Sequence, residues 1–279
     1  MSQGRVGHTW HFENPSIPRP DRSPCRIYRA MKFSEMTAPE IRAVTRADVL
    51  VVAPIAACEQ HGPHLPVFTD SILCQGVADG LERALPDRVL LLPTLWLGAS
   101  DHHLPFGGTL TATLPTYETI LVELLTPMLR EGFRRALLLN GHGGNIDPLR
   151  VALRRLVAEF PQAILTGSAY WELATDEIAA LCQGPRKSMG HACEIETSMM
   201  LHLRPDLVRT ERILDDPDTT PEALDGLFWA RDFGRRTVQG GVGHPQSASA
   251  ETGRKMLEAV VRRVVAVAGA LLAIPLPVA

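Results

Sequence analysis

The sequence lacks the long apolar runs, the excess of one charge and the cysteine spacing that mark several classes of protein. Its longest apolar stretch, residues 264–274, is shorter than the roughly 20 residues that a membrane-spanning helix needs, and the N-terminus does not read as a signal peptide. A net charge of -3 gives no electrostatic reason to expect binding to nucleic acid or to an acidic membrane surface. The five cysteines are scattered and have no Cys-x-x-Cys spacing, which argues against a disulfide framework. We therefore expect a soluble, cytoplasmic protein.

Nearly continuous apolar runs alternate with amphipathic patterns along most of the chain. Such runs are typical of strands that are covered on both faces, and we expect strands over residues 48–57, 87–98, 135–141 and 162–171. Helical patterns begin near residues 70, 116, 147, 193 and 251. This order predicts an α/β fold, a three-layer α/β/α sandwich with a mainly parallel sheet. We expect residues 1–27 to form an irregular arm and residues 28–279 a single domain.

One short stretch, "EQHGPHLPVFTD" from Glu59 to Asp70, follows the first expected strand and is crowded with ionisable groups. Glu59 and His61 are two residues apart, so on an extended segment their side chains point to the same side. Asp70 lies at an expected helix start, from which its carboxylate can turn back toward the strand end. All three side chains can therefore reach one site.

Polar clusters also follow the other strands. Ser100 and the "DHH" of residues 101–103 follow the second, His142 in "NGHGGN" follows the third, and "GHACEIETS" opens a later helix. Because ligands in open α/β sheets bind beyond the carboxyl ends of the strands, we expect these segments to converge. Carboxylates and imidazoles without thiolates suit two divalent ions, Zn²⁺, Mn²⁺ or Fe²⁺, that share a bridging carboxylate. Asp70 is the candidate bridge.

Together, "EQHGPHLPVFTD", "GASDHHLPFGGT", "NGHGGN" and "HACEIETS" resemble the signature segments of the creatininase family of metal-dependent amidohydrolases. The resemblance extends over roughly residues 35–260 and implies an α/β/α fold, a dinuclear metal centre and hydrolysis of a C–N amide-type bond. It also implies a homo-oligomer, possibly a hexamer, that takes a small-molecule amide such as a cyclic or linear amide or a formamide. A metal-bridged hydroxide would attack the substrate.

The resemblance also assigns roles by position. Glu59, Asp70 and His142 would bind one metal, and His61 and Asp70 the second. Ser100 takes the place of a substrate contact and His191 that of a catalytic histidine, which would protonate the leaving nitrogen.

Two departures from the family pattern bear on the substrate and on the second metal. Creatinine-hydrolysing members have a Tyr and a metal-binding Glu where this chain has Gly143 and Gly144, and a Trp-Asp pair where it has "RKSMG". Creatinine itself is therefore not the expected substrate. The second metal needs another carboxylate, for which Glu196 is the first choice and Glu194 the second.

Other interpretations of these residues stay open. The chain could be a non-catalytic metal or small-molecule binding protein, or a peptide-bond hydrolase in the maturation of a peptide-derived cofactor. The glycine-rich "NGHGGN" could instead cradle an anion at a helix N-terminus, as in an enzyme that acts on phosphate esters. The roles of His64 and His103 are undecided, with His64 expected to order its loop and His103 to have a structural place.

Overall fold

A four-stranded parallel sheet forms the centre of the computed structural model, which describes residues 31–224 and 227–277. Its strands are β1 (Leu50–Ile55), β2 (Val89–Leu91), β3 (Arg135–Asn140) and β4 (Ile164–Ala169), in the spatial order β2-β1-β3-β4. The predicted N-terminal arm, residues 1–27, lies outside the described residues. Each strand pairs in parallel with its neighbour, so all four carboxyl ends lie at the same edge of the sheet.

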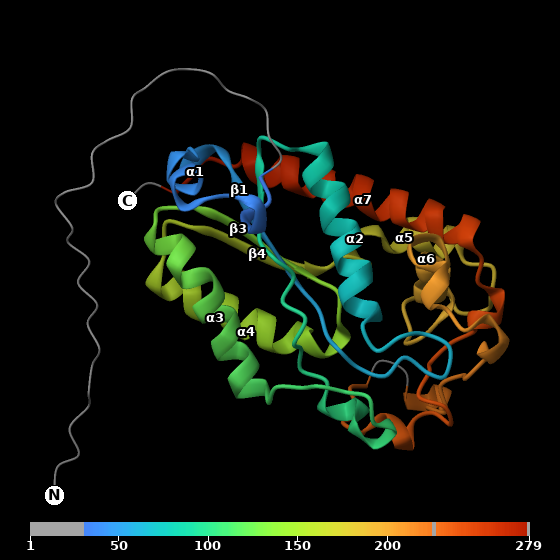
Figure 1. Ribbon diagram of the computed structural model, residues 1–279. Helices are drawn as coiled ribbons and strands as arrows, with labels where there is room; N and C mark the ends of the chain where they lie inside the picture. The colour runs from blue at the N-terminus through green and yellow to red at the C-terminus, as the bar shows by residue number, and fades with distance from the viewer. Residues whose placement is uncertain (1–30, 225–226, 278–279) are drawn as a thin grey trace, which may run out of the picture.

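Helices cover both faces of this sheet, as the alternating sequence pattern predicts (Figure 1). Side chains of β1 divide between two cores: Leu50 and Val52 pack in one, and Val51 and Ala53 pack in the other. The first core includes α2 (Thr69–Ala84), α5 (Thr175–Leu181), α6 (Glu194–Leu203) and α7 (Ala250–Ala273). The second includes α3 (Leu114–Arg130) and α4 (Ile146–Glu159). The three-layer α/β/α prediction is confirmed, and the short helix α1 (Ala38–Ala43) was not predicted.

The second expected strand is much shorter than residues 87–98. Within this segment only Val89–Leu91 belongs to the sheet, because Pro93 has no N–H to donate to a neighbouring strand. Beyond it the chain still follows β1: the amides of Leu92 and Leu95 donate to the carbonyls of Val52 and Pro54, at 2.9 Å each. Residues 92–95 therefore run beside β1 to the carboxyl edge of the sheet, joined to β1 by these two hydrogen bonds and without forming a regular strand.

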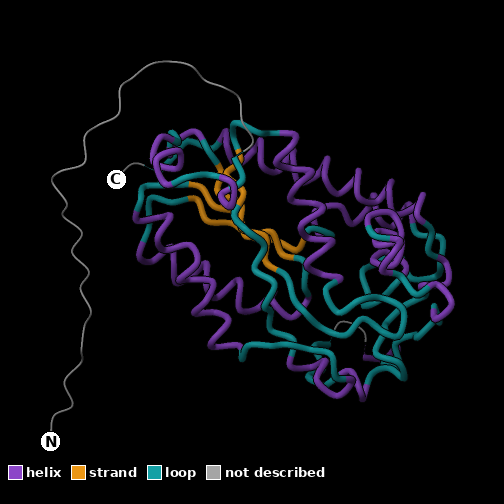
Figure 2. The backbone as a smooth tube through the Cα atoms, viewed as in Figure 1, coloured by secondary structure: helices purple, strands orange, loops and turns teal. Residues whose placement is uncertain are grey.

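Loops gather at the carboxyl edge of the sheet, where the structure has few regular elements (Figure 2). The four described cysteines, Cys58, Cys74, Cys182 and Cys193, are buried and free, in line with the prediction that they form no disulfide framework. No helix within the described part of the chain is both long and apolar enough to cross a membrane.

A close contact between α6 and α7 fixes the position of α6, whose first turn carries Glu194 and Glu196. A Cβ built on Gly253 of α7 would lie 1.8 Å from the carbonyl oxygen of Ser198 in α6. The amide of Ser249, which precedes α7, also donates to the Ser198 hydroxyl at 3.1 Å. Only glycine at position 253 lets the two helices approach this closely.

The substitution Gly253→Ala should therefore destabilise the protein, by about 3 kcal/mol, because the new methyl group overpacks a backbone contact. Gly269→Ala in the same helix is the control, since a Cβ there would meet nothing within 4 Å. That variant should keep or slightly raise the stability, because alanine favours helices. Urea unfolding of the two variants measures the difference, and equal stabilities would contradict this packing argument.

Candidate metal centre

The structure brings the predicted metal-binding residues together at the carboxyl edge of the sheet. Glu59 and His61 follow β1, Asp70 lies in the first turn of α2, His142 follows β3, and Glu196 lies in the first turn of α6. All five side chains are buried. The turn after His61 depends on Gly62, whose φ of 60° is a left-handed conformation that favours glycine.

Glu59, Asp70 and His142 meet in a first cluster. His142 Nδ1 lies 3.2 Å from Glu59 Oε1 and 3.1 Å from Asp70 Oδ2. On the other side of the imidazole ring, His142 Nε2 lies 3.1 Å from the carbonyl oxygen of Ala99. A carbonyl can only accept, so Nε2 carries a hydrogen and Nδ1 is the nitrogen available to a metal.

His61, Asp70 and Glu196 meet in a second cluster. His61 Nε2 lies 3.0 Å from Asp70 Oδ1 and 3.8 Å from Glu196 Oε1. His61 Nδ1 donates to the carbonyl oxygen of Glu59 at 3.0 Å, which again leaves the inward nitrogen as the ligand atom. Among the three carboxylates of these clusters, Asp70 is the one that lies against both His61 and His142, as expected of a bridging ligand.

Glu194 lies elsewhere, although it is only two residues from Glu196. Its two carboxylate oxygens accept hydrogen bonds from the backbone amides of Gln183, at 2.6 Å, and Gly184, at 2.8 Å. The carboxylate of Glu194 therefore anchors a loop, and Glu196 is the acidic side chain of this helix that faces the clusters.

Three oxygens of the two central carboxylates are buried and make no hydrogen bond of good geometry. They are Oε1 and Oε2 of Glu59 and Oδ2 of Asp70. A buried carboxylate oxygen without a partner is costly, and a cation is the usual compensation. With imidazole lone pairs beside them, these oxygens fit divalent metal ions.

The ionisation of the imidazoles follows from the same crowding. Burial alone would lower the pKa of His142, but Glu59 and Asp70 outweigh it and raise this pKa to about 10. Burial is likewise outweighed at His61, where Asp70 and Glu196 raise the pKa well above its usual value. Burial would raise the pKa of Asp70, yet His61 and His142 hold it well below its usual range. In the metal-free protein, protons on His61 and His142 therefore supply the positive charge that metal ions would otherwise supply.

Ser100 and His191 differ in their relation to the cluster. Ser100 is fully buried, and its hydroxyl lies 3.2 Å from Nε2 of His142, on the side of the ring that faces away from the carboxylates. This position suits support of His142, and a direct contact of Ser100 with substrate stays a prediction. His191 Nδ1 lies 3.6 Å from Glu59 Oε1, at the edge of the cluster.

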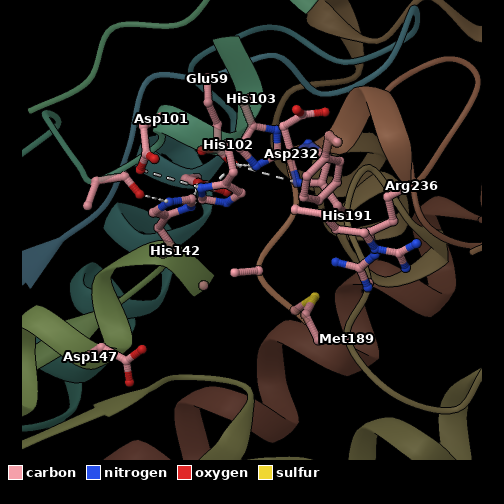
Figure 3. Close-up of a pocket in the computed structure, with 18 of the residues that line it drawn as sticks. Glu59, Asp101, His102, His103, His142, Asp147, Met189, His191, Asp232 and Arg236 are labelled. Carbon is pink, nitrogen blue, oxygen red and sulfur yellow. Dashed lines mark hydrogen bonds and ion pairs between the residues drawn. The ribbon is translucent and has the colours of Figure 1, made fainter. Parts of the chain in front are cut away.

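A cavity of about 680 Å³ opens over the carboxylates and imidazoles (Figure 3). Glu59, His103 and His142 lie on one side of it, with His191 and Arg236 on the other. Trp171 and Met189 form an apolar part of the remaining wall. Another part comes from a segment late in the chain and includes Phe228, Trp229, Arg231 and Phe233. The clusters are therefore accessible from a space large enough for an organic ligand.

The two glycines after His142 differ sharply in their surroundings. A Cβ on Gly143 would meet nothing within 4 Å. A Cβ on Gly144 would lie 2.1 Å from the carbonyl oxygen of Ala99 and 2.5 Å from His142 Nε2. In this conformation the loop has no room for the metal-binding glutamate that creatinine-hydrolysing proteins are expected to have at position 144.

Sequence reasoning missed several residues of the site. The missed residues are Gln60, which is buried against two histidines, and Phe233, whose ring centroid lies 4.1 Å from that of His103. His103 was named but its role was left undecided, and its Nε2 lies 3.3 Å from Glu59 Oε1. The segment "LFWARDFGRR", residues 227–236, supplies a wall of the cavity. Its aromatic and arginine residues within an otherwise irregular stretch were a signal that could have pointed to it. His64, left undecided, contacts the Thr197 hydroxyl at 2.8 Å through Nε2.

Comparison with known proteins gives consistent matches. The creatininase family profile, described as creatinine amidohydrolase, matches residues 34–268. A mycofactocin precursor peptide peptidase from Mycobacterium tuberculosis is 33% identical over 222 residues, which cover 76% of this chain and 81% of the relative. A creatinine amidohydrolase from Pseudomonas putida is 29% identical over 258 residues, which cover 84% of this chain and 94% of the relative.

Solved structures agree with these matches. A creatininase mutant of the Zn–Zn type has a TM-score of 0.74 at 27% identity, covering 86% of this chain and 97% of its own. A manganese form of creatininase has a TM-score of 0.70 at 26% identity, also covering 86% of this chain and 97% of its own.

Metal affinity should rise with pH. The pKa of His142 is raised to about 10, so below that pH the ring keeps a proton that a metal must displace. The affinity for Mn²⁺ should increase between pH 6.5 and 8.5, by up to about tenfold per pH unit for each proton displaced. Calorimetric titration in two buffers of different ionisation enthalpy measures both the affinity and the protons released. An affinity that is constant over this range, with no proton release, would contradict the assignment.

Proposed function

The chain belongs to the creatininase family, and on that premise we propose that it is a metal-dependent amidohydrolase that cleaves a C–N amide-type bond of a small molecule. The proposal rests on the three buried oxygens of Glu59 and Asp70 that make no hydrogen bond of good geometry. Two divalent ions would satisfy them, and the proposed ligands are Glu59, His61, Asp70, His142 and Glu196. The zinc and manganese forms of the related creatininases support either of these metals, and iron stays open.

Bound metal ions of this kind make water acidic near neutral pH and polarise a carbonyl group. The protein's own groups would hold the ligands and move a proton. Ala99 and Glu59 orient His142 and His61 through their backbone carbonyls. His191 would accept a proton at Nδ1 from the attacking water and return it to the leaving nitrogen, since its Nε2 already donates to the Gln60 carbonyl at 2.7 Å.

The cavity favours a substrate larger than creatinine. Its volume of about 680 Å³ lies in the range of pockets that hold drug-sized ligands. Arg236 lines the cavity, and its Nε and Nη2 bind Asp218 at 2.9 and 2.6 Å, which fixes the guanidinium in place. A fixed arginine in the wall favours an amide that carries a carboxylate or another anionic group.

A peptide-bond hydrolase is the second candidate function. The size of the cavity favours it, as does the similarity to a protein described as a mycofactocin precursor peptide peptidase. In either case the same carboxylates and imidazoles would serve, because hydrolysis of a peptide and of another amide passes through the same kind of tetrahedral intermediate.

The predicted homo-oligomer is a further part of the proposal.

A substrate panel tests the proposal. Protein loaded with Zn²⁺ or Mn²⁺ should hydrolyse at least one class among formamides, cyclic amides, N-acyl amino acids and short peptides, and should leave creatinine nearly untouched. Chelation should abolish the activity and added metal should restore it. Glu59→Gln, which keeps the shape and removes a charge, should lower the turnover more than about 100-fold.

The panel also separates the alternatives. Fully metal-loaded protein without turnover on any amide would leave a binding protein as the better account. Phosphatase activity that survives Glu59→Gln would instead favour an anion site at "NGHGGN".

A further inference from the structure

Gln60, between the metal-facing residues Glu59 and His61, has a buried side-chain amide with a fixed orientation. Its Oε1 accepts from the backbone amide of Gly62 at 2.9 Å, and its Nε2 donates to the backbone carbonyl of Gly240 at 2.8 Å. Rotating the amide by half a turn would place two donors together at Gly62 and two acceptors together at Gly240. The backbone therefore determines which end of the amide is nitrogen.

The backbone around Gly240 is held in a conformation that allows its carbonyl to accept from Gln60. Its φ of 87° favours glycine, and a Cβ at this position would lie 2.2 Å from Gln60 Oε1. The buried carboxylate of Asp216 accepts from the amides of Gln239, at 2.6 Å, and Gly241, at 3.2 Å. Asp216 thus holds the residues on both sides of Gly240, and through Gly240 it holds Gln60.

The orientation of Gln60 decides which nitrogen of His103 carries a hydrogen. Gln60 Nε2 lies 2.7 Å from His103 Nδ1, and an amide nitrogen can only donate. His103 Nδ1 is therefore the acceptor, and its hydrogen lies on Nε2. His103 Nε2 points toward the proposed metal ligands and lies 3.3 Å from Glu59 Oε1. The His103 side chain also lines the cavity.

His61, His142 and His191 have the reverse arrangement. Each donates its outer N–H to a backbone carbonyl. His61 donates to the carbonyl of Glu59, His142 to that of Ala99, and His191 to that of Gln60. Their inward nitrogens can therefore present lone pairs to a metal or to a proton. His103 alone among these four imidazoles presents an N–H to the cavity.

We infer that His103 is a hydrogen-bond donor to the substrate and not a metal ligand, and that Gln60 is the positioning residue that keeps it so. The inference rests on the proposed amide hydrolysis. In that reaction negative charge develops on the amide oxygen, and a buried N–H that needs no reorientation stabilises it. The donor keeps its hydrogen throughout, so no proton is transferred by His103.

Phe233 fixes the His103 ring from the other side. The two ring centroids lie 4.1 Å apart, and the Phe233 ring also lies 5.0 Å from the His191 ring. His103 is thus held between an apolar ring and the Gln60 amide, with its exposed fraction at 1%. This restraint keeps Nε2–H in place before a substrate arrives.

Two substitutions at position 103 separate a donor from a ligand. His103→Gln can place an amide N–H near the former Nε2, whereas His103→Asn reaches only the position of Nδ1. Both variants should keep the zinc content of the wild type. The turnover of His103→Asn should fall about 100-fold with little change in KM, and His103→Gln should recover most of it. Loss of zinc from both variants would show that His103 is a ligand and would overturn the inference.

Imidazole ¹⁵N spectra of the zinc-loaded protein test the same point without any substrate. His103 Nε2 should show the shift of a protonated nitrogen and Nδ1 that of an acceptor. In Gln60→Glu the carboxylate can accept from Nδ1, so the pattern at His103 should invert. A bare or zinc-bound Nε2 in the wild type would overturn the inference, and an unchanged pattern in Gln60→Glu would refute the role of Gln60.

These readouts stay informative if no amide is ever found to be hydrolysed. Zinc content and the spectra report on His103 alone, whereas the substrate panel reports on the reaction. Turnover of a panel substrate together with a zinc-bound His103 would refute the inference and leave the proposed function standing.

Discussion

The structure depends on one electrostatic constraint: Glu59 and Asp70 bury carboxylate oxygens that make no hydrogen bond of good geometry within the described residues. The burial of uncompensated negative charge is among the most costly arrangements in a protein. Protonated His61 and His142 offset it in the metal-free chain, which is why the pKa values of both rings are raised. Divalent ions would offset it more completely, and the backbone carbonyls behind both rings leave the inward nitrogens free for them.

The fold supplies this arrangement by bringing distant segments to one edge of the sheet. β1 and β3 are paired in parallel and end beside each other. The pairing of the two strands is therefore enough to bring together the loops that carry Glu59 and His142. Glu196 comes from α6, much later in the chain, and the close contact of α6 with α7 at Gly253 restrains its position. Packing between two helices therefore helps to set the position of a residue in the second cluster.

The alternation of apolar runs and helical patterns predicted the sandwich, and the carboxyl-edge rule for parallel sheets predicted which loops would meet. The sequence could not predict that Glu194 is taken up by the amides of Gln183 and Gly184, because that depends on where a distant loop lies. It also could not reveal Gln60, whose partner Gly240 lies 180 residues away and follows no periodicity. Ser100 was placed by resemblance, and its burial behind His142 became visible only in three dimensions.

The most direct test of the central claim is elemental analysis of metal per chain, on the wild type and on Asp70→Asn, after purification without chelator and with Mn²⁺ or Zn²⁺ offered back. If Asp70 bridges two ions, the wild type should hold about two metals per chain, and the variant should lose most of both. A wild type without stoichiometric metal would contradict the account, because the buried carboxylates would then be balanced by protons alone. Asp70→Asn with an unchanged metal content would contradict the bridging role of Asp70.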